Sequence, residues 1–207
     1  MLDQSPTPYV GSPFLAAVAW ATEVHRHDTR RDGRTPYLSH VLAVAALTMQ
    51  DGGDEATVTA AALHDTVERG GGAPLLREIR HRFGGEVADV VDACSDRDDP
   101  CELSWALRKA AHVERWRTEA LSVPALTVAA ADKLDNVRTL MTALRCEGPS
   151  AWDGYHAEPS EVIGYYVAML EILEARLPFS RNVLALRVAV TELAQVSDGV
   201  LEATAPI

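Results

Sequence analysis

Val58-Thr59-Ala60-Ala61-Ala62-Leu63-His64-Asp65 reads as an apolar helical run that ends in a histidine and a carboxylate. Desolvating these two side chains costs free energy unless hydrogen bonds or a cation compensate for the lost water. A bound metal ion is the usual compensation. The chain contains a second such dipeptide at His27-Asp28, so the pair alone is weak evidence. The interpretation therefore depends on which other residues converge on His64-Asp65.

Helical periodicity extends outward from this stretch over nearly the whole chain. Apolar residues mostly recur at spacings of three and four, and Gly and Pro fall between the periodic segments. The pattern predicts a single all-α domain of roughly nine helices over residues 1–207. Residues 178–207 are expected to form a C-terminal helical extension. The expected helices cover residues 13–27, 37–50, 54–69, 74–83, 85–94, 103–119, 124–144, 160–176 and 181–196.

Composition excludes several classes of protein. The hydrophobic fraction of 47% in 207 residues indicates a globular domain with a sizeable core. A net charge of -11 disfavours binding to nucleic acid, although a local basic cluster can still bind a small anion. No run reaches about 18 apolar residues, which predicts no membrane span.

The ends and the cysteines of the chain bear on its compartment. The first residues lack a basic region followed by an apolar core, so we expect no signal peptide. The three cysteines, Cys94, Cys101 and Cys146, are an odd number and show no CxxC spacing. A disulfide framework is therefore not expected, and a reducing cytoplasm is the predicted location.

Three separated segments offer metal-binding side chains near a helix face or end. His40 lies at the start of the second predicted helix, His64-Asp65 closes the apolar run of the third, and Asp132 follows the small, apolar run Val128-Ala129-Ala130-Ala131. Two imidazoles and two carboxylates suit a divalent ion that keeps waters, such as Mn²⁺, Fe²⁺, Zn²⁺ or Mg²⁺. A single His or Asp at a helix end is equally often a cap or a core hydrogen bonder, so from the residues alone both interpretations stay open for His40 and Asp132.

The order His40, His64-Asp65, Asp132 resembles the signature of the HD-domain metal-dependent phosphohydrolases. The similarity is greater to the RelA/SpoT-type (p)ppGpp hydrolases, especially the small alarmone hydrolases and their metazoan SpoT homologues. Four collinear segments within about residues 14–177 carry it: Thr35-Pro36-Tyr37-Leu38-Ser39-His40, Ala61-Ala62-Leu63-His64-Asp65-Thr66-Val67-Glu68, Arg82-Phe83-Gly84-Gly85-Glu86-Val87-Ala88-Asp89-Val90-Val91-Asp92, and Ala131-Asp132-Lys133-Leu134-Asp135-Asn136-Val137-Arg138-Thr139.

The resemblance implies an enzyme that removes the 3′-pyrophosphate of (p)ppGpp, giving GDP or GTP. The implied metal ligands are His40, His64, Asp65 and Asp132, most simply holding Mn²⁺. Glu68 would orient or deprotonate the attacking water, and Asn136 is a second implied catalytic residue. The implied contacts to the guanosine nucleotide are Arg30, Arg31, Lys133, Asn136, Arg138 and Thr139. Lys133 and Arg138 also have an interpretation as structural charges, and the Ala-rich helices are compatible with a homodimer.

Three positions depart from the family pattern. Arg69 follows Glu68 where relatives usually have Asp, Val41 replaces the proline after the first ligand, and Asp135 stands where relatives often have Tyr or His. The reversed charge at Arg69 puts the usual hydrolysis in doubt. Two alternatives therefore stay open: an HD phosphohydrolase that acts on another nucleotide, and a non-catalytic nucleotide-binding sensor.

Overall fold

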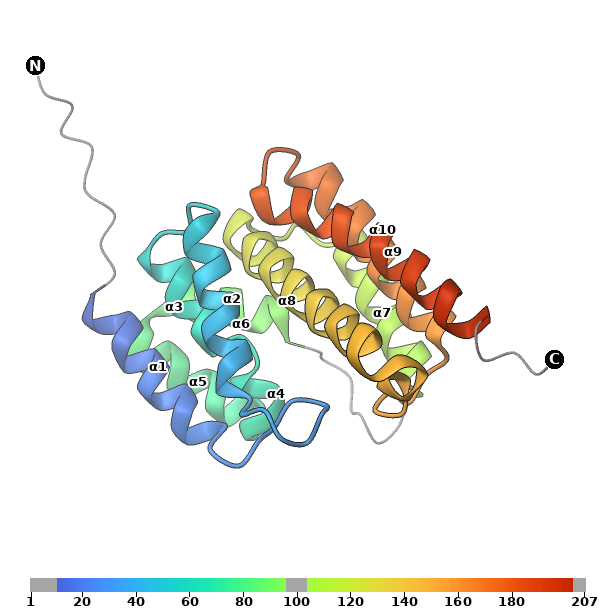
Figure 1. The fold of residues 1–207 in the computed structure, drawn as a ribbon. Coiled ribbons are helices and arrows are strands. Elements are labelled where there is room, and N and C mark those ends of the chain that lie inside the picture. Colours follow the sequence, from blue (N-terminus) through green and yellow to red (C-terminus); the bar gives the residue numbers. More distant parts are fainter. Residues whose placement is uncertain (1–10, 96–103, 203–207) are drawn as a thin grey trace, which may run out of the picture.

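The computed structural model describes residues 11–95 and 104–202, apart from the side chains of residues 69, 70 and 198–202 (Figure 1). The described residues are all-α, as predicted. They form α1 (Ser12–Val24), α2 (Leu38–Gln50), α3 (Glu55–Leu63), α4 (Thr66–Gly70), α5 (Ala73–Phe83), α6 (Gly85–Cys94), α7 (Trp105–Thr118), α8 (Val123–Glu147), the 3₁₀ helix η1 (Gly148–Trp152), α9 (Pro159–Arg176) and α10 (Arg181–Glu202). None of the described helices is both long and apolar enough to cross a membrane.

The long helix α8 lies between two groups of helices (Figure 1). Helices α1 to α6 pack around an N-terminal core, and α7, α9 and α10 pack around a C-terminal core. Ala125, Val128 and Ala131 of α8 belong to the N-terminal core, whereas Leu126 and Ala130 belong to the C-terminal core. This part of α8 is buried on both faces, which explains why its sequence is apolar without an amphipathic pattern. Side chains that emerge from it reach the junction of the two cores.

The third predicted helix is in fact two helices that meet at a corner. α3 ends at Leu63, and α4 begins at Thr66. The Thr66 hydroxyl donates a hydrogen bond of 2.6 Å to the Leu63 carbonyl. The ring of His64 turns back so that its Nδ1 lies 2.8 Å from the carbonyl oxygen of Ala61. The stretch contains no Gly or Pro that would indicate a break, so the sequence pattern predicts one continuous helix.

The predicted C-terminal extension is an integral layer of the fold. α10 packs along α8 and α9, and its Leu186 and Leu193 are fully buried. The amide of Asn182 donates a hydrogen bond of 3.0 Å to the carbonyl of Leu47 at the end of α2. α10 therefore also ties the C-terminal group of helices to the N-terminal group.

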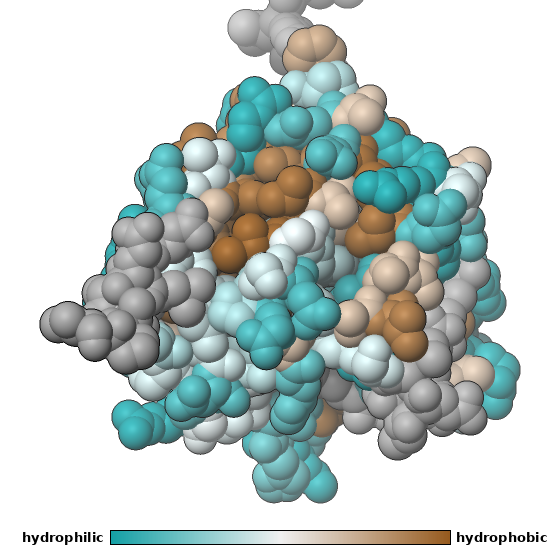
Figure 2. All heavy atoms as spheres, turned by 90° about the vertical axis from the view of Figure 1, so that its right-hand side faces the viewer, coloured by the Kyte–Doolittle hydropathy of each residue, from teal (hydrophilic) through white to brown (hydrophobic). Residues whose placement is uncertain are grey.

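One side of the molecule carries an apolar area. Viewed from the right-hand side of Figure 1, hydrophobic residues gather in an area bordered by hydrophilic ones (Figure 2).

Candidate active site

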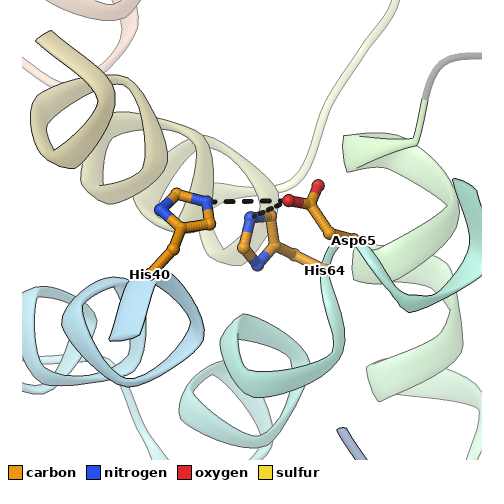
Figure 3. Close-up of side chains that lie close together, drawn as sticks. All are labelled: His40, His64 and Asp65. Carbon is orange, nitrogen blue, oxygen red and sulfur yellow. Dashed lines mark ion pairs between the residues drawn. The ribbon is translucent and has the colours of Figure 1, made fainter. Parts of the chain in front are cut away.

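Four predicted side chains from three places in the fold converge at the junction of the two cores. His40 comes from the first turn of α2, His64 and Asp65 from the α3–α4 corner, and Asp132 from α8. Figure 3 shows His40, His64 and Asp65 pointing toward one another. The Nε2 atom of His40 lies 3.6 Å from Asp65 Oδ2 and 3.3 Å from Asp132 Oδ1. The Nε2 atom of His64 lies 3.3 Å from Asp65 Oδ2 and 3.8 Å from Asp132 Oδ1.

Hydrogen bonds on the far side of each imidazole fix which nitrogen faces the cluster. His64 Nδ1 lies 2.8 Å from the carbonyl oxygen of Ala61, and His40 Nδ1 lies 2.6 Å from a carboxylate oxygen of Asp135. Both oxygens only accept, so each Nδ1 carries a hydrogen and each neutral ring turns the lone pair of Nε2 toward the cluster. Both Nε2 atoms are buried and have no hydrogen-bond partner among the described residues.

The residues present fit a divalent metal ion. Two lone-pair nitrogens and two carboxylate oxygens face one another, which leaves a buried place for positive charge. Ligand atoms about 2.1 Å from a shared ion lie about 3.0–3.5 Å apart. The four nitrogen–oxygen separations are 3.3–3.8 Å, which is long for hydrogen bonds and close to this spacing. Ligand atoms of His40, His64 and Asp65 all lie within 4.8 Å of one another, and Asp132 Oδ1 lies within 3.8 Å of both imidazoles.

The electrostatics of the cluster show the same demand for a cation. Burial by itself would lower the pKa of both histidines, but the neighbouring carboxylates outweigh it. They raise the pKa of His40 to about 9 and that of His64 well above its usual value. Burial would likewise raise the pKa values of Asp65 and Asp132, but His64 and His40 beside Asp65, and Lys133 and both histidines beside Asp132, hold them well below the usual range. In the absence of a metal ion, protons bound to the two histidines would supply the positive charge.

The two carboxylates are themselves held in position. The Tyr37 hydroxyl donates a short hydrogen bond to Asp65 Oδ2. Asp132 accepts from the amide of Asn136 at one oxygen and from the ammonium of Lys133 at the other, each at 2.5 Å. Lys133, expected to bind substrate, therefore contacts a cluster carboxylate directly, in line with its alternative interpretation as a structural charge.

His40, Asp65 and Asp132 line a cleft of about 940 Å³, at the upper end of the volumes of small-molecule sites, and His64 lies buried behind them. Glu68 lines the same cleft and is exposed. Because the helix breaks at His64-Asp65, Glu68 lies in the first turn of α4 rather than near the end of a longer helix. A carboxylate is favoured at that position by the helix dipole. The side chain of Arg69 lies outside the described residues.

The loop that carries Arg30 and Arg31 is shaped by its own side chains. Asp32 accepts hydrogen bonds of 2.9 Å from the backbone N–H groups of Arg34 and Thr35. Gly33 has a φ of +66°, a conformation that glycine adopts without strain. The loop closes with an antiparallel bridge between Thr29 and Pro36 and presents both arginines to the cleft.

Arg30 reaches across to α8. Its Nη2 donates to Asp135 Oδ2 at 3.3 Å, to Asn136 Oδ1 at 3.1 Å and to Thr139 Oγ1 at 3.1 Å. The sequence predicts Arg30, Asn136 and Thr139 for one nucleotide pocket, and the structure brings all three together. Arg138 also lines the cleft, with an exposed side chain.

Arg31 reaches the loop after η1. Its Nη1 donates a hydrogen bond of 3.1 Å to the carbonyl of Gly154, and its guanidinium carbon lies 3.9 Å from the ring centroid of Tyr155. No sequence pattern indicated Tyr155 or Lys109, which lines the cleft from α7, because both lie far from the four family-like segments. Tyr37 was within a quoted motif, but nothing in its spacing indicated a bond to Asp65.

Comparison with known proteins agrees with this geometry. Residues 17–151 match the HD domain family. The guanosine-3′,5′-bis(diphosphate) 3′-pyrophosphohydrolase MESH1 of Xenopus tropicalis is 34% identical over 172 residues, which are 79% of this chain and 90% of that protein. The enzyme of Haemophilus influenzae with the same activity in its name is 34% identical over 125 residues, or 58% of this chain but only 17% of that protein.

Solved structures share the fold. The structure of a metazoan orthologue of SpoT, described as hydrolysing ppGpp, superimposes with a TM-score of 0.70 at 24% identity and covers 91% of this chain and 97% of that one. A Listeria monocytogenes protein gives 0.63 at 29% identity and covers 74% of this chain and 97% of that one. Because the HD domain model matches residues 17–151 and the chain covers 90% of the Xenopus enzyme, the chain belongs to the HD-domain family, in the branch of the guanosine-3′,5′-bis(diphosphate) 3′-pyrophosphohydrolases.

Proposed function

We propose that this protein hydrolyses the 3′-pyrophosphate of (p)ppGpp. Water adds to the phosphorus attached to the 3′ oxygen, the bond between them breaks, and the products are GDP or GTP and pyrophosphate. The observation that carries the proposal is the convergence of His40, His64, Asp65 and Asp132 beside a cleft with a basic rim, which three of them line. The activity named for the Xenopus and Haemophilus relatives supports the choice of substrate.

His40, His64, Asp65 and Asp132 would hold the metal ion, and we propose Mn²⁺ because the mixed nitrogen and oxygen ligands suit it. When bound, such an ion supplies a Lewis acid that lowers the pKa of a coordinated water. The two cluster carboxylates match the charge of a divalent ion. The hydrogen bonds that Tyr37 and Asn136 donate to these carboxylates keep the oxygens oriented before the ion arrives.

Glu68 is the proposed proton acceptor for the attacking water. It lines the cleft from the first turn of α4, directly after the corner that carries His64-Asp65. Its side chain is exposed and therefore accessible to a water molecule in the cleft. Asn136 supports the reaction from the other side, since it donates to Asp132 and accepts from Arg30.

The rim of the cleft suits a polyanionic nucleotide despite the acidic chain. Arg30, Arg31, Lys109 and Arg138 line it from the loop 29–36, α7 and α8. A guanidinium can bind phosphate through two parallel hydrogen bonds or stack on a purine ring. Arg31 already lies over an aromatic ring, that of Tyr155, so its geometry is compatible with stacking on guanine.

The proposal is tested by measuring pyrophosphate release from ppGpp with Mn²⁺, comparing the wild type with Asp65→Ala. Release by the wild type and its loss in the variant are the expected results. Hydrolysis of other nucleotides but not ppGpp would replace the proposed substrate. Tight binding of ppGpp by the wild type without turnover would replace the enzyme by a nucleotide sensor.

A homodimer and a cytoplasmic location stay predictions from the sequence. Light scattering coupled to size-exclusion chromatography measures the mass in solution, and fractionation of the source cells locates the chain. A single-chain mass would contradict the homodimer.

A further inference from the structure

One carboxylate oxygen contacts both ends of the site. Oδ2 of Asp135 lies 2.6 Å from Nδ1 of His40 and 3.3 Å from Nη2 of Arg30. The His40 side chain is fully buried, and the side chains of Arg30 and Asp135 are only 11% and 19% exposed. Asp135 is therefore neither a solvated surface charge nor a residue of the four-ligand cluster.

Toward the cluster, Asp135 determines how His40 presents itself. Its carboxylate can only accept, so the hydrogen of the neutral imidazole stays on Nδ1 and Nε2 points to Asp65 and Asp132. A carboxylate behind a metal-binding histidine fixes the ring and makes the nitrogen on the far side a stronger ligand. His64 has only a neutral carbonyl, that of Ala61, in the equivalent place.

Toward the nucleotide pocket, Asp135 anchors Arg30. Three acceptors surround the Nη2 atom of Arg30, and Asp135 is the charged one beside neutral Asn136 and Thr139. All three hydrogen bonds carry the charge of the guanidinium, and Asp135 adds the opposite charge, which helps to offset the rotamer freedom that a long side chain loses. Arg30 starts from a loop, so this anchor decides where its guanidinium stands in the cleft.

We propose that Asp135 is a positioning residue that joins the metal ligand His40 to the substrate-binding Arg30 through one oxygen atom. The inference rests on the proposed metal centre and function, because it assigns His40 and Arg30 their roles there. It makes two separable predictions. Removing the carboxylate weakens metal binding through His40, and it weakens nucleotide binding through Arg30.

The first experiment measures Mn²⁺ affinity without any turnover. Chelator-stripped wild type, Asp135→Asn and Asp135→Ala are titrated with MnCl₂ in a calorimeter, with Asp153→Asn as a charge-matched control that lines the same cleft. We expect Asp135→Ala to raise the dissociation constant about 10- to 100-fold, with Asp135→Asn in between because its amide oxygen can still accept from His40. The control should stay within about twofold of the wild type.

Thermal melting of the metal-free proteins checks that each variant folds. If Asp135→Ala does not fold, the comparison uses Asp135→Asn, which keeps the shape of the side chain. Folded Asp135 variants that bind Mn²⁺ as tightly as the wild type would overturn the inference while leaving the metal centre intact. A wild type that binds no Mn²⁺ would overturn the metal centre and the role of Asp135 together.

The second experiment separates the role of Asp135 at Arg30 from its role at His40. The dissociation constant of ppGpp is measured on metal-free protein, where hydrolysis does not interfere, for Arg30→Gln, Asp135→Asn and the double variant. We expect Asp135→Asn to weaken binding about tenfold in the wild type but less than about twofold in the Arg30→Gln background. Its effect on Mn²⁺ should persist in both backgrounds. Equal losses of ppGpp binding in both backgrounds would contradict the link to Arg30.

Discussion

The two His-Asp pairs of this chain have the same residues and different surroundings. His27-Asp28 follows α1, where His27 is exposed and Asp28 turns back to His25, with 2.9 Å between Asp28 Oδ2 and His25 Nδ1. His64-Asp65 lies at a corner between two helices, and both side chains face groups from α2 and α8. The first pair makes a local contact within three residues, whereas the second joins distant parts of the chain. What distinguishes the proposed metal site from this partly buried local contact is the set of partners from elsewhere in the fold.

The largest expected effect comes from removing the carboxylate of each pair in turn. Asp65→Ala deletes a proposed metal ligand and should lower kcat for ppGpp by about 1,000-fold or more. Asp28→Ala removes the same group next to His25 and should lower kcat by less than about threefold. Steady-state kinetics with Mn²⁺ and the bound metal content of both variants measure this contrast. Similar losses in the two variants would remove the distinction between the pairs.

Glu68 extends the comparison to a residue with no counterpart near His27-Asp28. Glu68→Gln keeps the size of the side chain but cannot accept the proton of the attacking water. We expect kcat to fall about 100- to 1,000-fold while the Mn²⁺ content stays near that of the wild type. Metal analysis of the protein used in the assay separates this result from ligand loss. Normal turnover in Glu68→Gln would assign the proton to another acceptor.

The two arginines of the loop after His27-Asp28 should differ from each other. Arg30 is half-buried among the side chains beside the proposed metal ligands, whereas Arg31 is exposed and contacts a carbonyl and a tyrosine ring. Arg30→Gln should raise KM for ppGpp about tenfold or more, and Arg31→Gln by a few-fold. A larger increase in KM for Arg31→Gln than for Arg30→Gln would mean that Arg31 is the stronger contact to the nucleotide.

The smallest effects are those of pH on the metal-free protein. Because the folded protein raises the pKa of His40 from 6.5 to about 9, this histidine contributes stability that is complete below pH 6.5 and is lost as the pH rises through 9. His64 shifts in the same direction. Asp65 and Asp132, with lowered pKa values, contribute stability above pH 3.8 that is lost in acid. The Tm of metal-free protein should therefore fall between pH 6.5 and 9.

Added Mn²⁺ should oppose that fall because it competes with protons for the same nitrogens. Below the pKa of each histidine, apparent affinity should rise about tenfold per pH unit for each proton displaced. The Tm increase caused by a fixed Mn²⁺ concentration should thus grow from pH 6.5 to 8.5. An increase that shrinks over this range would contradict the cluster as the binding site. The control is Asp65→Ala, which lacks one of the proposed metal ligands.

The spacing of apolar residues and the positions of Gly and Pro were enough to predict the all-α class and most helix positions, because amphipathic spacing follows directly from burial of one helix face. The four side chains of the cluster were also within reach, since His40 begins a predicted helix, His64-Asp65 and Asp132 each follow an apolar run, and their order resembled a known family. The corner at His64-Asp65 was not predictable in this way. It depends on bonds from Thr66 and His64 back to backbone carbonyls, which ordinary helical residues make only in the packed protein.

The partners of the site residues were the least predictable part. Asp135 lies three residues after Asp132, but its contacts are with His40 and Arg30, 95 and 105 residues away. Tyr155 meets Arg31 because the loop after η1 and the loop 29–36 line the same cleft. Such pairings follow from the three-dimensional arrangement of α2, α8 and two loops, which no local pattern encodes.

The central claim is that one divalent ion sits where the two histidines and two aspartates converge. Anomalous diffraction from crystals grown with Mn²⁺ tests it most directly. The account predicts one strong peak about 2.0–2.3 Å from Nε2 of His40, Nε2 of His64 and a carboxylate oxygen of each of Asp65 and Asp132. An absence of any peak there, or a peak bound by other residues of the cleft, would contradict it.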